Sequence, residues 1–587
     1  MKTCLKPPFL ILIAALTFSC QGLPEPEIVE PQPQEEEKPK PEEKPKPGEY
    51  VLPVIETTDM HGYIVNKDND DIHYRLAYVA DKVKDIRGRG EEYSKDKLLL
   101  LDGGDLYQGA SVSNMLAGKP IYVSMDMMEY DAVALGNHEF DWGIEDMVDQ
   151  DATLPDYERD GSRHDNLVPI VCANLYQDGS KVLWTNEYVI VEKSALNSKG
   201  ECARVKIGVV GFANNYASSI MASKFTGKGY YIRDDFSEAN RIASSLEASG
   251  QCDATVLLIQ GAADDAAEKL GRSSVIDLVL GGHSHQTMSG KTSWGLPYLQ
   301  GGRYCEHYAY ADMQFTVDDE GEISFKSVAN RVTPTVDSRK DLHTSPGQNS
   351  EDLEEDILTV SDEAVAAVAQ QLNDVIGYID VGATSYYLSG SGDRAATISN
   401  WMCDITRRIG EADVAFVNAG GIRTVLPLNG QSKRDITVSN VYEMFPFNNL
   451  IYVYEITYAE LLHLLEFSLT SGGAGLFSRM TGIDCYYADY SVLSLRKDGE
   501  EIYSNGKWAD DWASRKVILA ASEYLATSER TDYYTGISNP LIEWNSTPRL
   551  LYNDLVDNEN AVLVLRAESA ASGGHLYIDT KTYYHLQ

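Results

Sequence analysis

Ala-Val-Ala-Leu-Gly-Asn-His-Glu-Phe-Asp, at residues 132–141, is the stretch that decides the fold. Its first four residues are an apolar run typical of a short buried strand, and a glycine ends the run. An amide, an imidazole and a carboxylate then follow within five positions, from Asn137, His138 and Asp141. Because open α/β sheets place their sites at the carboxyl ends of strands, the stretch predicts an α/β fold with a functional site at this edge.

The same order, an apolar run followed by a polar cluster, recurs through residues 50–290. Apolar runs of four to six residues are typical of strands that are buried on both faces. The further runs are 51–55, 98–101, 205–210, 255–259 and 276–280. The polar side chains that follow them include Asp59, His61, Asp105, Gln260, His283 and His285.

These polar residues have the chemistry of metal ligands. Asp59 and His61 are two positions apart, so in an extended chain both would point the same way. Together with Asp105, Asn137 and the histidines they predict a site for two divalent ions, suited to Zn, Mn, Fe or Co. Two ions about 3.5–4 Å apart can clamp a phosphoryl oxygen and activate water. Each motif alone is weak, since a lone Asp-x-His is usually a surface loop and Gly-His-Ser-His suits a structural histidine pair.

His138 has a different expected role, because a residue next to Asn137 cannot easily point at the same ion. We expect its ring to face the substrate, with Asp141 orienting the ring and raising its basicity.

The composition excludes one class of partner. The chain has 587 residues and a net charge of −39, whereas a surface for DNA or RNA needs a basic stripe. A phosphorylated small molecule is not excluded, because a local metal ion or arginine can dominate over a screened acidic surface. The oligomeric state is left open.

The N-terminus is expected to be a targeting segment. Lys2 and Lys6 precede an apolar segment, 9–18, that is too short to span a bilayer. Residues 16–20, Leu-Thr-Phe-Ser-Cys, resemble a bacterial lipoprotein cleavage box with Cys20 as the lipidated residue. We therefore expect a signal peptide at 1–20 and an exported, membrane-anchored lipoprotein in the periplasm or on the outer surface of an outer membrane; the alternative is an ordinary secretory peptide.

The rest of the chain divides into two expected domains. Residues 21–49 are rich in Pro, Glu and Lys and predict an extended linker. The first domain is expected at 50–345, a connecting helix within 346–374, and a second α/β domain at 375–587. Near the C-terminus only the run 561–565 indicates structure, and we interpret it as a strand. The six cysteines that follow Cys20 in the chain match no zinc or redox spacing.

Four blocks now carry a family resemblance: 59–61 (Asp-Met-His), 104–105 (Gly-Asp), 136–139 (Gly-Asn-His-Glu) and 282–285 (Gly-His-Ser-His). They resemble the calcineurin-like metallophosphoesterases. Asn-Ala-Gly-Gly-Ile-Arg at 418–423 and Pro-Phe-Asn-Asn at 446–449 narrow the resemblance to the 5′-nucleotidase family. It implies a four-layer αββα metallophosphoesterase sandwich and a second α/β domain, joined by a linker helix.

The resemblance also implies roles. One metal would be held by Asp59, His61, Asp105 and His285, and the other by Asp105, Asn137 and His283. His138 and Asp141 would be the catalytic pair. Gln260 departs from the family, which usually has a histidine there. It is either a weaker, neutral ligand that favours a hard ion such as Mn, or only a hydrogen-bonding residue, or a sign of lost activity.

The second domain is implied to bind the nucleotide. Arginines would hold the phosphate side of the substrate and two aromatic rings would stack on the base, worth about 1–3 kcal/mol for each stacked base. The alternative to stacking on the base is that the two aromatic residues pack in the hydrophobic core. The residues implied are Arg394, Asn418, Arg423, Phe447, Asn449, Tyr524 and Asp532.

The function expected from this resemblance is metal-dependent hydrolysis of extracytoplasmic nucleotides to nucleoside and phosphate. A 2′,3′-cyclic-nucleotide phosphodiesterase, a UDP-sugar hydrolase and a non-catalytic nucleotide-binding lipoprotein remain alternatives.

Overall fold

The computed structural model describes residues 44–68, 71–89, 92–142, 168–214, 224–335, 353–383, 397–418, 421–447, 449–470, 478–489, 491–527, 549–578, 581 and 583–587. Cys20, Arg394, Asp532 and the signal peptide lie outside the described residues, as does most of the expected linker. Pro45–Gln587 forms one compact unit. None of the described helices is both long enough and apolar enough to cross a bilayer.

Each of the predicted apolar runs forms a strand, which confirms the prediction from sequence. The strands are buried along most of their length because other layers cover both faces of the sheet. They are β1 (Gly48–Thr57), β4 (Leu99–Asp102), β5 (Ala132–Ala134), β10 (Cys202–Ala213), β12 (Ala254–Gln260) and β13 (Leu278–Gly281).

Parallel pairing brings the carboxyl ends of these strands to one edge. β1 pairs with β4, β4 with β5, β10 with β12, and β12 with β13, all in parallel. Within the described residues, hydrogen bonds link twelve strands into one sheet system. Its other members are β6 (Ile170–Val171), β9 (Tyr188–Leu196), β14 (Thr287–Lys291), β15 (Pro297–Gly301), β16 (His307–Val317) and β17 (Ile323–Pro334).

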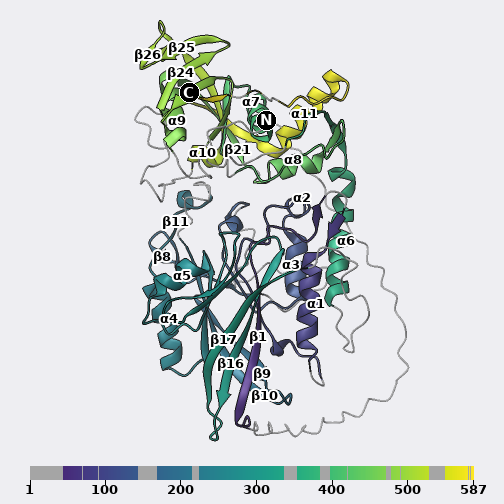
Figure 1. The fold of residues 1–587 in the computed structure, drawn as a ribbon, viewed down its shortest axis with the longest axis vertical. Helices are drawn as coiled ribbons and strands as arrows, with labels where there is room; N and C mark the ends of the chain where they lie inside the picture. The colour runs from purple at the N-terminus through teal and green to yellow at the C-terminus, as the bar shows by residue number, and fades with distance from the viewer. Residues whose placement is uncertain are drawn as a thin grey trace, which may run out of the picture. The chain divides into compact units, whose positions relative to one another are not determined.

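Alternate residues of single strands contribute to different apolar clusters, and this alternation produces the layers. In β12, Val256 and Leu258 belong to the cluster between the strands, whereas Leu257 and Ile259 pack toward helices α4 (Ser237–Ala248) and α5 (Ala263–Leu270). In β1, Ile55 instead joins the cluster beneath α1 (Arg75–Arg87), α3 (Lys119–Met127) and α6 (Leu353–Leu372). Figure 1 shows the two helical layers on opposite sides of the strands. The first half is therefore a four-layer αββα sandwich.

Helix α6 is the connecting helix expected from sequence. A buried ion pair between Lys84 of α1 and Glu354 fastens its first turn to the first half. Leu372 ends the helix, and β18 (Val375–Ile379) begins the second half three residues later.

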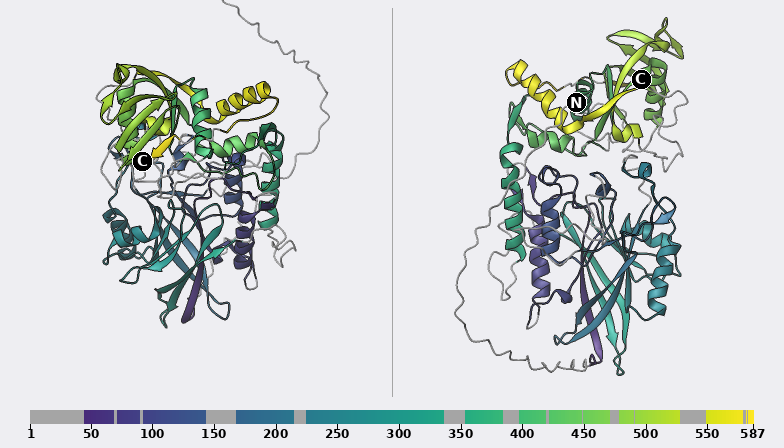
Figure 2. Two further views of the ribbon diagram at one scale, coloured as in Figure 1. Left: turned by 45° about the horizontal axis from the view of Figure 1, so that its top comes forward. Right: turned by 180° about the vertical axis from the view of Figure 1, so that it is seen from behind.

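The second half is also α/β. A five-stranded sheet, in the order β22-β19-β27-β21-β28, packs with α7, α8, α9 and α11, and a second sheet has the order β26-β25-β24-β23-β29. Figure 2 shows this half, coloured green to yellow, from two further sides. The helices are α7 (Thr397–Ile409), α8 (Val438–Met444), α9 (Tyr458–Thr470), α10 (Glu523–Thr527) and α11 (Asp557–Ser572). The strands are β19 (Val414–Asn418), β20 (Arg434–Thr437), β21 (Leu450–Thr457), β22 (Ser478–Thr481), β23 (Asp484–Ala488), β24 (Ser491–Lys497), β25 (Glu500–Ser504), β26 (Lys507–Trp508), β27 (Lys516–Ser522), β28 (Arg549–Val556) and β29 (Tyr584–Leu586).

One local prediction is wrong: residues 561–565 lie inside helix α11 and not in a strand. A short apolar run does not separate a strand from a buried helical turn. Here the flanking residues favour a helix. Asp557 and Glu559 lie in its first turn, and Gly573, with φ of 72°, ends it in the left-handed conformation.

The buried pair between α1 and α6 predicts a large effect on stability. Lys84→Met would leave the Glu354 carboxylate, whose side chain is fully buried, without its cation, and should lower the free energy of unfolding by about 3–5 kcal/mol. Lys95→Met is the control, because Lys95 pairs with Glu129 at the surface and should cost at most about 1 kcal/mol. Urea unfolding followed by tryptophan fluorescence measures both. Equal midpoints for the two variants would contradict the assigned role of the pair.

Candidate active site

The carboxyl ends of five strands carry the predicted metal ligands. Each ligand lies within four residues of the end of its strand, and parallel pairing brings these ends together. The strands and side chains are β1 with Asp59 and His61, β4 with Asp105, β5 with Asn137, β12 with Gln260, and β13 with His283 and His285.

The backbone has the left-handed conformation at five of these ligand positions. The φ angles are 50° at Asp59, 48° at His61, 57° at Asp105, 68° at His283 and 58° at His285. Such conformations cost about 1–3 kcal/mol each and persist only where the surroundings hold them. The expected extended chain from Asp59 to His61 is therefore wrong: β1 has already ended, and a tight turn brings the two side chains to the same side.

Hydrogen bonds between neighbouring loops hold this backbone in place. The Asp59 amide donates to the Gly104 carbonyl and the His61 amide to the Asp105 carbonyl, both at 2.9 Å. The His283 amide donates to both carboxylate oxygens of Asp59 at 3.0 Å. The loops after β1, β4 and β13 thus fix one another before any ligand binds.

One group of candidate ligands is formed by Asp59, His61 and His285, whose ligand atoms lie within 4.8 Å of one another. His61 Nε2 is 3.0 Å from His285 Nε2, which is 3.6 Å from Asp59 Oδ1. His61 Nδ1 lies 2.8 Å from the Gln108 carbonyl, which can only accept. Nδ1 therefore carries the proton, and the Nε2 lone pair faces the group.

The charge state of this group suits a cation. Burial lowers the pKa of His61 well below its usual range, and the charges of His138 and Arg423 act in the same direction. Burial likewise lowers the pKa of His285. Both shifts favour the neutral imidazole, which is the form that binds metals.

The second set of candidate ligands lies beside the first. Ligand atoms of His61, Asp105 and His138 lie within 4.8 Å of one another. Asp105 Oδ1 accepts a hydrogen bond from the His138 amide at 2.9 Å. Asn137 Oδ1 lies 2.9 Å from His283 Nδ1, so an amide oxygen and an imidazole nitrogen face each other across the loops after β5 and β13.

Gln260 is fully buried at the end of β12, and its amide lies among these loops. Its Nε2 lies 3.5 Å from Asp59 Oδ1, whereas its Oε1 has no hydrogen-bond partner among the described residues. A Cβ atom on Gly104 would lie 3.1 Å from this oxygen, and one on Gly282 only 2.4 Å. An unpaired buried acceptor costs about 1–3 kcal/mol, and a cation beside it would remove that cost.

Carboxyl groups buried beneath the loops would also be stabilised in their ionised form by a nearby positive charge. Burial raises the pKa of Asp59 and Asp105 and, behind them, those of Glu56, Asp102 and Glu139, and mutual repulsion adds to it. Carboxylate, imidazole and amide oxygen form a mixed donor set that suits divalent transition metals. The orphaned Gln260 oxygen and this donor set fit two bound divalent ions.

His138 and Asp141 form the predicted pair. His138 lies in a short 3₁₀ turn, 138–140, and its Nδ1 is 2.7 Å from Asp141 Oδ2. Burial lowers the pKa of His138 to about 3, and the charge of Arg423 adds to this effect. One ring nitrogen of His138 lies within 4.8 Å of the candidate ligand atoms of His61 and Asp105.

Glu139 is a residue whose role we did not predict. Its buried carboxylate accepts three backbone hydrogen bonds, from Asp105 at 3.1 Å, Leu106 at 2.7 Å and Gly136 at 2.7 Å. It thereby ties the loop after β4 to the loop after β5. The signals in the sequence were its place in the Gly-Asn-His-Glu block at 136–139 and its charge in a turn that follows a buried strand.

Two predicted substrate residues of the second half face this site. The Phe447 ring stacks against His138 with 5.6 Å between centroids. The Arg423 guanidinium lies 5.1 Å from the centre of the Phe447 ring. Arg423 also lowers the pKa of Asp141, against the larger effect of burial, so its charge acts on the candidate catalytic pair.

The other predicted substrate residues lie elsewhere. Asn418 and Asn449 line a small cavity of about 20 Å³ with Phe447. Asn449 also donates to Asp557 Oδ2 at 3.2 Å, so it anchors the start of α11. Tyr524 lies half-buried in α10 and is not among the described residues that line either cavity.

Comparisons with known proteins address both halves. Residues 375–502 match the model of the 5′-nucleotidase C-terminal domain. The snake venom 5′-nucleotidase of Crotalus adamanteus is 24% identical over 544 residues, which cover 85% of this chain and 79% of that protein. The 5′-nucleotidase of Vibrio cholerae is 22% identical over 490 residues, covering 77% of this chain and 82% of that protein.

The fold agrees with these matches. The crystal structure of a 5′-nucleotidase precursor from Thermus thermophilus aligns with a TM-score of 0.63 at 18% identity, covering 91% of this chain and 99% of that one. The chain therefore has the fold of this solved 5′-nucleotidase precursor. The chain is thus similar to 5′-nucleotidases along both halves, and its residues 375–502 match the C-terminal domain of these proteins.

Glu139 generates a prediction about metal binding. Glu139→Ala should free the loops that carry Asp105 and Asn137, and so raise the dissociation constant for Mn²⁺ about 10–100-fold, as outer contacts of metal sites typically do. Isothermal titration calorimetry with MnCl₂ measures this dissociation constant. Glu139→Gln keeps an acceptor oxygen and should therefore lose less affinity for Mn²⁺. An Ala variant that binds Mn²⁺ as tightly as the parent would rule out the bridging role.

Proposed function

We propose that the chain hydrolyses the phosphate ester of extracytoplasmic nucleotides and releases nucleoside and phosphate. One observation carries the proposal: candidate metal ligands from five strand ends, the His138–Asp141 pair and the Arg423 charge all act at one edge of the sheet. The 5′-nucleotidase relatives favour nucleotides as the substrate class.

The donor groups suggest how two ions would be held. Asp59, His61 and His285 would bind one, and Asn137 and His283 the other, with Asp105 shared between them and Gln260 Oε1 as a neutral donor. Bound there, divalent ions supply Lewis-acid polarisation of the phosphoryl group and lower the pKa of water. The protein's own contribution is to hold these donors in place through the hydrogen bonds between loops.

His138 would transfer a proton to the leaving group, and Asp141 would stabilise the protonated ring. An incoming phosphate dianion opposes the effect of burial, so the ring of His138 gains a proton, and Asp141 stabilises the resulting imidazolium. As water forms a bond to phosphorus, the bond to the leaving oxygen breaks. That oxygen takes the proton from His138 Nε2, and a proton released by the attacking water restores the ring.

Arg423 and Phe447 would bind the substrate from the second half. The guanidinium attracts the phosphate, and the Phe447 ring offers a stacking surface next to His138. Arg394, Asn418, Asn449, Tyr524 and Asp532 stay predictions for the same task.

We also propose that Cys20 carries a lipid anchor. The support is the sequence alone: a basic start, a short apolar segment and the Leu-Thr-Phe-Ser-Cys box before the Pro-, Glu- and Lys-rich stretch. An extended spacer of that composition would hold the enzyme away from the membrane surface.

Phosphate release from AMP tests the activity. Asp105→Ala should abolish turnover in Mn²⁺, and His138→Ala should reduce kcat about 10²–10⁴-fold, while Asp264→Ala, an exposed acid of α5, should have no effect. UDP-glucose and 2′,3′-cyclic AMP are assayed in parallel to identify the ester that is cleaved. Full activity of the Asp105 variant, or nucleotide binding without turnover in Mn²⁺, Zn²⁺, Mg²⁺ and Co²⁺, would refute the proposal.

Fractionation tests the anchor. In a bacterial host, the full chain should partition into the membrane fraction, and Cys20→Ser should move it to the soluble fraction or leave it unprocessed. Cys202→Ser is the control, since Cys202 is an exposed residue of the folded part. Identical partitioning of the Cys20 variant and the parent would exclude lipidation there.

A further inference from the structure

Strand β15 carries none of the candidate ligands, although it pairs with β13, the strand that precedes the Gly-His-Ser-His block. Its residue Gln300 lies opposite Gly281 of β13, and the Gln300 side chain is fully buried. A turn after the strand then reaches Tyr304. Gln300 and Tyr304 both contact loops of the candidate metal site, and the chemistry proposed above uses neither of them.

The Gln300 side chain joins the loop after β12 to the loop after β13. Its Nε2 donates to the Ser284 hydroxyl at 2.7 Å, and its Oε1 accepts from the Ala263 amide at 3.4 Å. That amide belongs to the first turn of α5, where the helix itself supplies no acceptor. One buried side chain therefore fastens the start of α5 to the loop after β13, much as Glu139 fastens the loops after β4 and β5.

Ser284 matters for the metal site because it lies between His283 and His285. The backbone at both histidines is left-handed, with φ of 68° and 58°. Such a conformation persists only where the surroundings hold it. The Ser284 amide donates to the Gly282 carbonyl at 2.7 Å, and the Ser284 hydroxyl accepts from Gln300. The residue between the two imidazoles is thus held by its backbone and by its side chain.

The Tyr304 ring packs in T-shaped contacts against two imidazoles. Its centroid lies 5.7 Å from that of His61 and 5.8 Å from that of His285, at interplanar angles of 74° and 69°. Edge-to-face pairs of this kind are a preferred arrangement of aromatic rings. The Tyr304 amide also donates to the Asp59 carbonyl at 2.9 Å. Tyr304 therefore contacts every member of the candidate ligand group formed by Asp59, His61 and His285.

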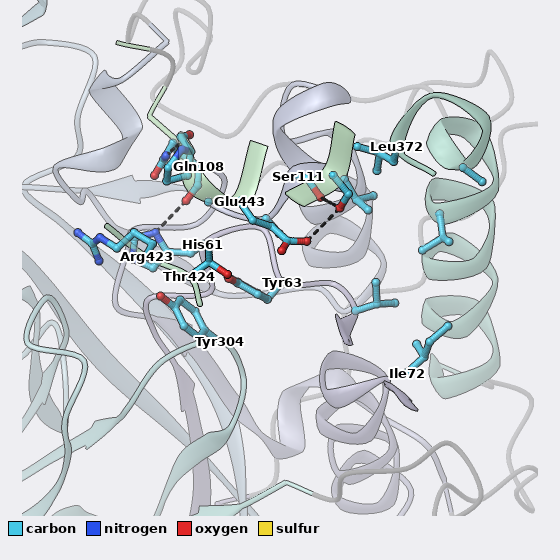
Figure 3. A pocket seen from close by; sticks show the side chains of 18 of the residues that line it. His61, Tyr63, Ile72, Gln108, Ser111, Tyr304, Leu372, Arg423, Thr424 and Glu443 are labelled. Carbon is cyan, nitrogen blue, oxygen red and sulfur yellow. Dashed lines mark hydrogen bonds between the residues drawn. The ribbon is translucent and has the colours of Figure 1, made fainter. Parts of the chain in front are cut away.

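Tyr304 is itself held in place. Its φ is 54°, its carbonyl accepts from Asn66 Nδ2 at 3.4 Å, and its ring lies 4.1 Å from the Tyr63 ring, centroid to centroid. Both tyrosines line a cavity of about 380 Å³ that His61 also lines, and Figure 3 shows the three side chains close together. A ring fixed in this way limits the rotation of the imidazoles that it contacts.

We propose that residues 300–304 position the imidazole ligands of the metal site. Gln300 fixes the loop of His283 and His285 through Ser284, and Tyr304 fixes the ring orientation of the imidazoles that it contacts. The proposal rests on the proposed function, because it requires these histidines to bind the metal ions. Contacts behind metal ligands typically change metal affinity about 10–100-fold, whereas a segment that only packs in the core changes stability alone.

Mn²⁺ binding to the full chain, measured by calorimetry without substrate, tests the role of Gln300. Gln300→Met keeps the length of the side chain and removes both hydrogen bonds, and Ser284→Ala removes the hydroxyl. Each should raise the dissociation constant about 10–100-fold. The double variant should bind Mn²⁺ as Gln300→Met does, because both changes break the same contact. Losses that multiply in the double variant, or unchanged affinity of either single variant, would overturn this role.

A second pair of the same kind supplies the control. The Ser327 hydroxyl donates to Gln314 Oε1, also at 2.7 Å, between β17 and β16. Gln314→Met should therefore leave the affinity for Mn²⁺ unchanged. Urea unfolding of each variant separates a loss of metal affinity from a loss of the fold, and Ser284→Ala, a small deletion at a half-buried position, keeps the test valid if Gln300→Met does not fold.

The absorption spectrum of bound Co²⁺ tests Tyr304, because its visible bands depend on the arrangement of the ligands. Tyr304→Leu removes the ring, and should shift these bands and weaken Co²⁺ binding about tenfold or more. Tyr304→Phe keeps the ring and should keep both the spectrum and the affinity. Tyr486→Leu is the control, since Tyr486 stacks on His585 at 4.4 Å in the second half. A Tyr304→Leu protein with the spectrum and affinity of the parent would overturn the role of Tyr304.

Neither measurement needs hydrolysis, so the two proposals fail in different ways. A parent protein that binds the ions but releases no phosphate from AMP would refute the proposed function and leave the positioning role standing. A parent that hydrolyses AMP, with variants that bind Mn²⁺ and Co²⁺ as the parent does, would refute only the positioning role.

Discussion

Burial of several carboxyl groups side by side is the constraint on which the rest of the structure depends. Asp59 and Asp105 are removed from water at the sheet edge, and Glu56 and Asp102 lie behind them. Ionised carboxylates are costly in such surroundings unless cations or hydrogen-bond donors compensate them. Backbone amides supply part of the compensation, as the His283 amide does for Asp59, and the rest is the electrostatic demand that bound divalent ions would meet.

The same constraint accounts for the strained backbone of the loops. A left-handed residue turns the chain sharply, so donors two residues apart can reach the same point although the strand has ended. Glu139 compensates for part of that strain by accepting hydrogen bonds from backbone amides of both adjoining loops. The geometry of the candidate site is thus supported by a residue that is not itself a candidate ligand.

Much of the first half could be predicted from the sequence, since continuous apolar runs at β1, β4, β5, β10, β12 and β13 have few other structural meanings. The meeting of Asp59 with His285 followed from parallel strand ends. The left-handed turns and the clamp by Glu139 did not, because they depend on hydrogen bonds between loops distant in sequence. The prediction of a strand at 561–565 was wrong for a different reason: a run of five apolar residues occurs both in buried strands and in buried helices.

Gln108 joins two features that are usually separate. Its carbonyl fixes the proton on His61 Nδ1, and its side-chain amide donates to the Pro446 carbonyl of the second half at 2.5 Å. One residue therefore sets the tautomer of a candidate ligand and contacts the segment that carries Phe447. If Gln108 couples ion binding at His61 to the contact with Pro446, thermodynamic reciprocity requires that each strengthens the other by the same free energy.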